Sequence, residues 1–186
     1  VQLIRQKDDQ PLFLYLAFLA PHVPIAPAEE FQGTSQAGSY GDFIQQLDAC
    51  VGKVLDALRT HGLVDNTLLI FTSDNGAVLH LEALNAGHRA NGMLLGQKTD
   101  AWEGGHRVPF IARWPGRIPA GSQANQLLGL TDLMATLAAA AGVAFGDRPT
   151  VFGALALLST VAMVPLLFRG LATPILARLD AAITER

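Results

Sequence analysis

Three short apolar runs alternate with stretches of helical spacing along the chain. Residues 12–18, 68–72 and 108–114 are almost continuously apolar and are bounded by turn residues, which predicts buried strands. Between the first two runs, apolar side chains recur three and four residues apart over residues 39–61, as on one face of a helix. A strand, a helix and a second strand in this order predict a parallel, right-handed crossover. The first two strands should then end at the same edge of an α/β sheet.

The ends of the predicted helices carry recognisable capping residues. Ser39 is a candidate N-cap for the helix over residues 39–61, and Gly62 is a candidate for the position just past its end. A second helix is predicted over residues 131–141, with Thr131 as its cap and Gly142 closing it. The pattern therefore predicts helices flanking a mainly parallel sheet.

Composition narrows the class of protein only a little. The 186 residues suffice for one domain with a sizeable core, and 50% of them are hydrophobic. The mean hydropathy of +0.30 is high for a soluble protein. A net charge of −3 supplies no basic surface for nucleic acid, and a single cysteine excludes an internal disulfide. The first ten residues lack the layout of a signal peptide and do not begin with Met, so we expect a fragment.

Polar side chains follow two of the predicted strands. His22 comes just after residues 12–18, between Pro21 and Pro24, and Asp74-Asn75 come just after residues 68–72. Carboxylate and amide oxygens at a strand end suit Ca²⁺ or Mg²⁺ better than a soft metal. The alternatives are a plain turn for the Ser-Asp-Asn-Gly segment and a surface-loop histidine for His22. From these residues alone both interpretations stay open.

The chain after the second strand has no clean period. Residues 77–100 are rich in Gly, Asn and His, and we expect a long loop there, of the kind that often carries function. Lys98 lies near its end, where a solvated charge is the alternative interpretation. Gly104-Gly105 then predict a backbone conformation closed to other residues.

Several segments together resemble one family, the sulfatases of the arylsulfatase type in the alkaline-phosphatase-like superfamily. The resemblance covers about residues 11–143. It rests on FLYLAFLAPHVPIAP, YGDFIQQLDACVGKVLDAL, NTLLIFTSDNG, LLGQKTDAWEGGHRVPFIARWPG and LTDLMATLAAAAG, in the order of the family. The resemblance implies an alkaline-phosphatase-like α/β fold and hydrolysis of sulfuric esters.

The resemblance also implies roles for individual residues. Asp74 and Asn75 match the family's ligands for calcium, with magnesium the less favoured ion. His22 and Lys98 match the residues that contact the sulfate group, and they are the expected catalytic and substrate-binding pair. Positive or donor groups stabilise the negative charge that develops on sulfate oxygens. Glu103 and the two glycines after it are expected to shape the backbone beside Lys98 rather than to touch substrate.

Two features depart from the family pattern. The nucleophile of the family is a formylglycine made from the cysteine of a Cys-x-Pro-x-Arg segment, whereas Cys50 is followed by Val-Gly-Lys inside a predicted helix. Asp8-Asp9 do not fit the paired aspartates that should end an early strand. Residues 1–146 are therefore interpreted as a partial sulfatase catalytic domain that is inactive by itself. Cys50 is interpreted as a packing thiol.

The tail, residues 147–186, departs from the family pattern as well. Residues 151–168 carry no charge, which is at the threshold for a membrane span. A helical hairpin packed on the domain is the alternative, although Pro165 and Pro174 would break it. Contact with a membrane through residues 151–168 stays an open possibility at this point.

Three functions are weighed on this basis. The first is a sulfatase fragment acting on a small sulfate ester or a sulfated glycan, with calcium as the cofactor and an extracytoplasmic location by family. The second is a phosphomonoesterase or phosphotransferase of the same superfamily, which would carry a richer set of Asp and His metal ligands. The third is a membrane-tethered fragment without enzymatic activity. The Asp-Asn pair and the WEGGHRVPF segment favour the first.

Overall fold

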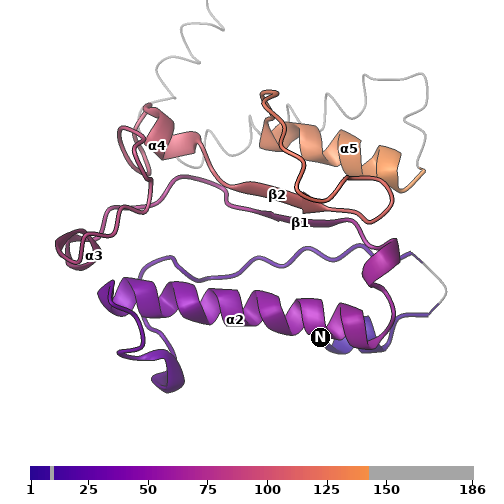
Figure 1. The fold of residues 1–186 in the computed structure, drawn as a ribbon, viewed down its shortest axis with the longest axis horizontal. Coiled ribbons are helices and arrows are strands. Elements are labelled where there is room, and N and C mark those ends of the chain that lie inside the picture. The colour runs from indigo at the N-terminus through magenta and orange to yellow at the C-terminus, as the bar shows by residue number, and fades with distance from the viewer. Residues whose placement is uncertain (9–10, 143–186) are drawn as a thin grey trace, which may run out of the picture. The chain divides into compact units, whose positions relative to one another are not determined.

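The computed structural model describes residues 1–8 and 11–142, which fall into parts of two compact units. The first unit spans residues 1–127 and the second begins at Leu128. The helices and strands of the first unit (Figure 1) are α1 (Gln2–Arg5), α2 (Gly38–Thr60), β1 (Leu69–Thr72), α3 (Leu81–Asn85), α4 (Glu103–His106) and β2 (Phe110–Arg113), with short 3₁₀ turns at Glu29–Phe31 and Val64–Asn66. The described part of the second unit has a 3₁₀ turn, Leu130–Asp132, followed by α5 (Leu133–Ala140).

Helix α2 confirms the helix predicted from apolar spacing, and it ends as expected. Gly62 has a φ of 66°, a left-handed conformation that glycine adopts without strain. Its amide donates to the Arg59 carbonyl at 3.1 Å, and the Leu63 amide donates to the Leu58 carbonyl at 2.9 Å. This pair of bonds is the Schellman arrangement. The predicted cap at the other end is wrong, because Ser39 lies inside the helix and Ala37 is the N-cap.

The sheet is antiparallel, where a parallel pairing was predicted. β1 and β2 pair from Leu69 opposite Arg113 to Thr72 opposite Phe110. Parallel neighbours need a crossover connection, usually one long helix. The chain between β1 and β2 instead turns back through a loop with two short helices, α3 and α4. Both strands lie within the predicted runs, so the positions were right and the relative direction of these two was wrong.

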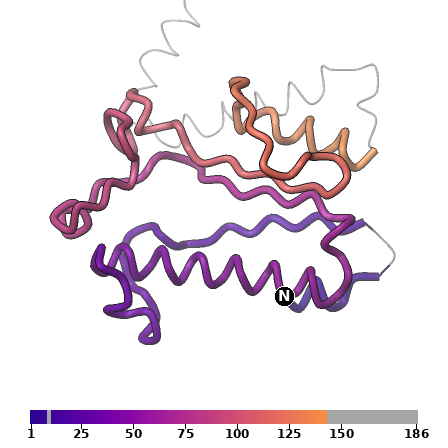
Figure 2. The backbone as a smooth tube through the Cα atoms, viewed as in Figure 1, coloured from indigo at the N-terminus to yellow at the C-terminus, as the bar shows by residue number. Residues whose placement is uncertain are grey.

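The first predicted strand, residues 12–18, forms no ladder with any described residue. The segment is extended and runs in the same direction as β1, with α2 returning between them in the chain (Figures 1 and 2). Its side chains are mostly exposed, with Phe13 at 73% and Tyr15 at 81%. A strand needs a neighbour about 5 Å away to pair with, and an apolar run is buried only where something covers it. The predicted burial is therefore wrong for most of this run.

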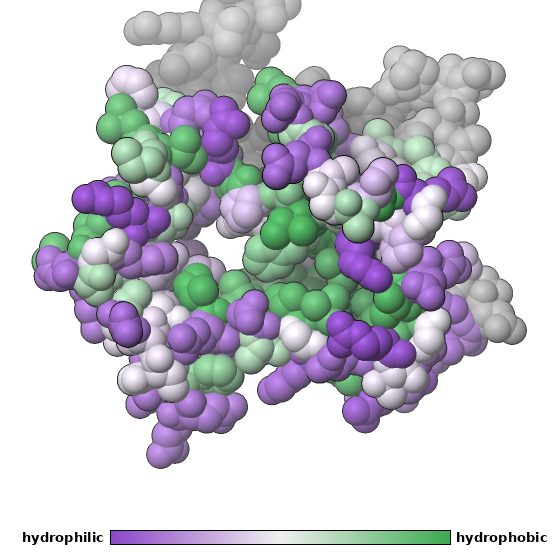
Figure 3. Space-filling view, viewed as in Figure 1, coloured by the Kyte–Doolittle hydropathy of each residue, from purple (hydrophilic) through white to green (hydrophobic). Residues whose placement is uncertain are grey.

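A small apolar core packs α1 and the extended segment of residues 12–18 against α2 and β1. Ile4, Ala57 and Leu58 are its buried members. Leu14, Val54, Leu63, Val64 and Leu69 are half-buried and pack against them. Hydrophobic side chains also gather at the surface over the strip between α2 and the strands (Figure 3). Large apolar side chains thus remain in contact with water on this face, as the exposure of residues 12–19 indicates.

In the second unit the helix begins two residues later than predicted. Asp132 is the N-cap of α5, and its Oδ2 accepts a hydrogen bond from the Gly129 amide at 2.9 Å. The predicted cap, Thr131, lies in the preceding 3₁₀ turn. Gly142 has a φ of 72° just past the helix, as expected for a residue that closes it.

The tail prediction, residues 147–186 with the apolar stretch 151–168, lies outside the described residues. Across the described ranges, 1–8 and 11–142, no helix combines the length and apolar character needed to cross a bilayer.

Candidate active site

The predicted metal ligands follow β1 directly. Asp74 is exposed and Asn75 is half-buried, in the bend after Thr72. The Asn75 side-chain nitrogen Nδ2 donates to the Gly76 backbone carbonyl at 3.2 Å. The Ser73 hydroxyl donates to the Asn75 backbone carbonyl at 3.0 Å. The strand therefore delivers one carboxylate and one amide to its carboxyl end, as the sequence predicts.

Three glycines allow close backbone approaches here: Gly76 to α4, and Gly104 and Gly105 of α4 to the loop that carries Lys98. The Gly76 amide donates to the Gly105 carbonyl at 2.9 Å, and the Gly104 amide donates to the Leu95 carbonyl at 2.8 Å. A Cβ on Gly76 would lie 1.8 Å from the Gly104 carbonyl oxygen. A Cβ on Gly105 would lie 2.1 Å from the Asp100 oxygen, and one on Gly104 would lie 2.3 Å from the Gly96 oxygen. Only glycine fits at such backbone approaches.

The glycine pair is therefore needed for a different reason from the one predicted. Gly104 and Gly105 are both buried, and both lie inside α4 with no positive φ. They are required because the backbone passes close to them. The Glu103 carboxylate pairs with Arg107, just past the end of α4, and lies 3.6 Å from the His106 ring nitrogen.

Lys98 is held against the same bend. Its backbone amide donates to the Ala77 carbonyl at 3.1 Å, three residues after Asp74. The Lys98 side chain is half-buried. The loop that carries it is not wholly irregular as predicted, because α3 lies within it. That helix is five residues long, and its N-cap, His80, makes no side-chain cap bond, so neither period nor cap marks it in the sequence.

His22 is less firmly placed. The residue is exposed and lies between two cis prolyl bonds, Ala20–Pro21 and Val23–Pro24. Its Nδ1 lies 2.7 Å from the Val23 carbonyl, and its amide donates to the Leu19 carbonyl at 2.8 Å. These contacts are local, and none of the contacts described for His22 reaches the other predicted site residues. The structure thus joins Lys98 to the end of β1 and leaves His22 on its own segment.

The donor set at the end of β1 suits part of a calcium site. The Asp74 and Asn75 side-chain oxygens are hard donors. Calcium takes about 6–8 oxygen ligands. Among the described residues, no three His, Cys, Asp or Glu side chains gather into a group that could hold a metal. The two side-chain oxygens are fewer than calcium takes, and the metal role of Asp74 and Asn75 stays a prediction.

Cys50 lies in the interior of α2 and is half-buried. The helix is the one expected around Cys50 from the sequence. Its role as a packing thiol stays a prediction.

One residue of the site region was missed in the sequence. Asn91 lies in the Gly- and Asn-rich loop, where Asn is an ordinary turn residue. Its Oδ1 accepts from the Ala77 amide at 3.0 Å, and its Nδ2 donates to the Ala77 and Gly96 carbonyls at 3.1 Å each. These partners are five and fourteen residues away, and no local pattern signals such bonds.

Two titratable groups near the start of α2 are perturbed. The backbone amides of Gly33 and Ser35 donate to the Asp42 carboxylate at 2.8 and 2.7 Å and hold its pKa below the ordinary value. Burial raises the pKa of Tyr40, whose ring stacks on that of His80 with centroids 4.6 Å apart. Asp42 thereby fixes the loop that leads into the helix.

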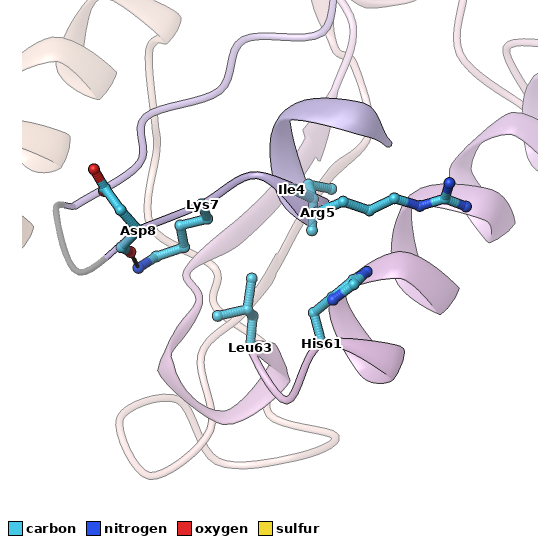
Figure 4. Close-up of a pocket in the computed structure, with 6 residues that line it drawn as sticks. All are labelled: Ile4, Arg5, Lys7, Asp8, His61 and Leu63. Carbon is cyan, nitrogen blue, oxygen red and sulfur yellow. Dashed lines mark hydrogen bonds between the residues drawn. The ribbon is translucent and has the colours of Figure 1, made fainter.

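Two surface pockets among the described residues lie away from this chemistry. One, of about 270 Å³, is lined by residues of α1, of the segment just after it and of the turn after α2: Ile4, Arg5, Lys7, Asp8, His61 and Leu63 (Figure 4). In it the Lys7 ammonium donates to the Asp8 carbonyl at 2.5 Å. A second, of about 440 Å³, includes Asp42 and Glu82. Neither includes a predicted site residue. Strand-end position and hydrogen bonding, and not concavity, identify the site here.

Comparison with known proteins places these observations in a family. The sulfatase family model matches residues 1–143. The chain is 46% identical over 140 residues to N-acetylgalactosamine-6-sulfatase of Canis lupus familiaris, covering 75% of this chain and 26% of that protein. It is 41% identical to the steryl-sulfatase of Rattus norvegicus over 143 residues, covering 75% of this chain and 24% of that one. The chain thus spans about a quarter of the length of these relatives.

Solved structures agree. A 6S-sulf protein linked to glycosaminoglycan metabolism in Bacteroides thetaiotaomicron has a TM-score of 0.73 and 38% identity, and the match covers 78% of this chain and 32% of that one. Ps i-CgsB, solved in complex with k-i-k-neocarrahexaose, has a TM-score of 0.68 and 32% identity, covering 79% and 32%. The predicted partial α/β domain of the alkaline-phosphatase-like class is confirmed. The chain belongs to the sulfatase family.

Proposed function

We propose that this chain is the part of a sulfate ester hydrolase that holds the sulfate-binding lysine and two oxygen ligands of a calcium ion. The observation that carries the proposal is the hydrogen bond from the Lys98 amide to the Ala77 carbonyl at 3.1 Å, which ties the lysine to the end of β1. The bond brings the backbone of Lys98 to Ala77, three residues after Asp74, which supports a shared site for the cation and the carboxylate. Family membership supports the reaction class.

The proposed roles follow from charge. Cleavage of a sulfate ester builds negative charge on the sulfate and leaving-group oxygens, and fixed positive or donor groups stabilise it. The Lys98 ammonium would bind a sulfate oxygen, and His22 would donate a hydrogen bond to the same group once its segment is brought to the site. Asp74 and Asn75 would hold Ca²⁺, which, when bound, supplies further positive charge beside the sulfate.

We propose further that the chain does not hydrolyse sulfate esters by itself. The covalent step needs an activated nucleophile. Cys50 is half-buried within α2 and lacks the proline and arginine of the Cys-x-Pro-x-Arg segment. Purified chain assayed with an aryl sulfate should show no turnover above the buffer rate, and Cys50→Ala should behave identically. Turnover that Cys50→Ala abolishes would make Cys50 the nucleophile and refute this part of the proposal.

The metal role can be tested separately from catalysis. Calcium titration of the chain, followed by NMR, should show weak binding, on the order of 10⁻³ M, because two ligands are few. Asp74→Ala should remove the shifts at the end of β1. Asp65→Ala is the matched control, an exposed aspartate in the turn before the same strand. Equal loss in both variants would mean general screening by calcium and would contradict the proposed site.

The substrate is proposed only as a class: a small sulfate ester or a sulfated glycan. Relatives of similar identity include an N-acetylgalactosamine-6-sulfatase and a steryl-sulfatase, so similarity does not select one substrate. The extracytoplasmic location that the family implies is carried as part of this proposal. An in-frame Cys-x-Pro-x-Arg segment in the neighbouring genomic sequence would support an active enzyme.

A further inference from the structure

The Asn91 side chain connects the bend after β1 with the chain just before Lys98. Its oxygen accepts one hydrogen bond and its nitrogen donates two, at 3.0 to 3.1 Å. Both ends of the amide are therefore in use, because a carboxamide carries an acceptor oxygen and a nitrogen with two donor hydrogens. Asn91 itself is half-buried, so these bonds are partly shielded from water.

The bonded atoms lie next to the proposed site on both sides. Ala77 comes three residues after Asp74, and Gly96 comes two residues before Lys98. The Ala77 carbonyl accepts from both the Asn91 amide nitrogen and the Lys98 backbone amide, at 3.1 Å each. A single carbonyl thus takes one bond from the residue that clamps the loop and one from the lysine.

The backbone beside Lys98 is strained in a way that needs such support. Thr99 has a φ of 78°, and it is a β-branched residue in a left-handed conformation. Strain of this kind persists only where the surroundings fix the chain. The Asp100 carboxylate accepts from the Gln97 amide at 3.0 Å, and the Gln97 side-chain oxygen accepts from the Leu79 amide at 2.9 Å. The lysine is therefore held at both flanks.

We propose that Asn91 is a positioning residue that sets where Lys98 stands relative to Asp74 and Asn75. Asn91 does not touch the sulfate group; it acts through Lys98. The inference rests on the proposed function, because it requires Lys98 to bind a sulfate oxygen. An alanine at position 91 leaves the Ala77 amide and the Gly96 carbonyl without this partner. The lysine loop then loses its asparagine tie to the strand end and keeps the bond from the Lys98 amide to the Ala77 carbonyl.

The test is a double-mutant cycle with inorganic sulfate as the probe. Sulfate is titrated into the full chain and its binding followed by NMR for the unmodified chain, Asn91→Ala, Lys98→Ala and the double variant. One exposed ion pair supplies up to about fivefold in affinity, so Lys98→Ala should weaken binding by about that factor. Asn91→Ala should weaken it by about threefold alone and by nothing further in the Lys98→Ala background.

The control is Asn85→Ala, which removes an exposed amide from the same loop and should leave sulfate binding unchanged. If Asn91→Ala does not fold, Asn91→Ser, which keeps one donor, takes its place and should give an intermediate loss. Thermal unfolding of each variant separates loss of fold from loss of position.

The possible results separate a failure of the proposed sulfate site from a failure of the Asn91 role alone. No effect of Lys98→Ala, or no sulfate binding at all, would overturn the proposed sulfate site and this inference with it. A loss with Lys98→Ala but none with Asn91→Ala would leave the proposed function standing and overturn the positioning role. Equal losses from Asn91→Ala in both backgrounds would do the same, since the effect would not pass through Lys98.

Discussion

The two halves of the proposed site are built in different ways. Lys98 and the bend after β1 are joined by backbone bonds, by the Asn91 side chain and by buried glycines. The segment that carries His22 has one half-buried leucine in the core, and most of its apolar side chains face water.

The two halves differ in which contacts determine their conformation. The conformation of the lysine half is determined by hydrogen bonds within about thirty residues of chain, all of them among the described residues. The histidine half follows the apolar run of residues 12–18, and the described residues leave most side chains of that run exposed. The lysine half is therefore held by hydrogen bonds among the described residues, whereas most apolar side chains of the histidine half face water.

The largest effect is expected from a substitution that separates α4 from the loop carrying Lys98. Gly105→Ala would place a Cβ 2.1 Å from the Asp100 carbonyl oxygen, and backbone cannot yield as a side-chain tip can. We expect a loss of about 3 kcal/mol in the free energy of unfolding, measured by urea denaturation.

Gly52→Ala is the matched control for this substitution. Gly52 lies in α2, and a Cβ there would meet nothing within 4 Å. Alanine should raise the free energy of unfolding by about 0.5–1 kcal/mol, because glycine is unfavourable inside a helix. A loss of similar size in both variants would show that the close approach at Gly105 is unimportant.

The next largest effect is expected in the histidine half, at its one anchoring side chain. Leu14 packs against the core around Leu58, whereas its neighbour Phe13 is 73% exposed. Leu14→Ala should lower the free energy of unfolding by about 1–2 kcal/mol, a reduced value for a half-buried side chain. Phe13→Ala should change it by less than about 0.5 kcal/mol. The reverse order would mean that the exposed face of this segment is covered in solution.

A smaller change in the free energy of unfolding is expected in the lysine half, at Thr99. Thr99 has a φ of 78°, a conformation that glycine adopts freely. Thr99→Gly should stabilise the fold by up to about 1 kcal/mol, since relieved strain exceeds the added chain entropy. Amide hydrogen exchange at Lys98 should nevertheless become faster. A destabilised variant would show that Thr99 contributes more through its side chain than its backbone strain removes.

The smallest effect concerns pH and the loop before α2. Backbone amides of Gly33 and Ser35 lower the folded-state pKa of Asp42, so the carboxylate stabilises the fold above its unfolded pKa and loses that effect as pH falls through the lower, folded value. Stability should therefore decline below about pH 4. Asp42→Asn should be less stable at pH 7 and show a shallower acid decline. Thermal melts from pH 7 to pH 2 would contradict this if both proteins declined equally.

Much of the fold could be predicted because it follows from local pattern. The apolar spacing of α2 and the glycine at its end were sufficient to place that helix, and both strands lie within the predicted runs. The direction of β2 relative to β1 was not accessible, because it depends on the path of the intervening loop. Burial of residues 12–18 could not be predicted either, since burial is a property of what packs against a run.

The site divides in the same manner. Asp74, Asn75 and Lys98 were identified through segments that resemble a family, and the structure brings the bend and the lysine backbone together. Asn91 was missed because its partners are distant in sequence. Gly104 and Gly105 were noticed for conformational freedom, yet the structure requires them for their small size.

The close approach of Gly76 to the Gly104 carbonyl gives a criterion for reading other chains. An Asp-Asn-Gly segment or a Glu-Gly-Gly segment alone is compatible with an ordinary turn. The two segments are in contact, because a Cβ on Gly76 would lie 1.8 Å from the Gly104 carbonyl oxygen, whereas a Cβ on Gly104 would meet the Gly96 carbonyl oxygen at 2.3 Å. A chain that replaces the glycine after the Asp-Asn pair should therefore hold its Glu-Gly-Gly segment farther from the strand, and one that replaces the glycine of the second segment should displace the loop that carries the lysine. Both glycines together, more than the match of any single segment, are then the mark of a lysine held at the strand end.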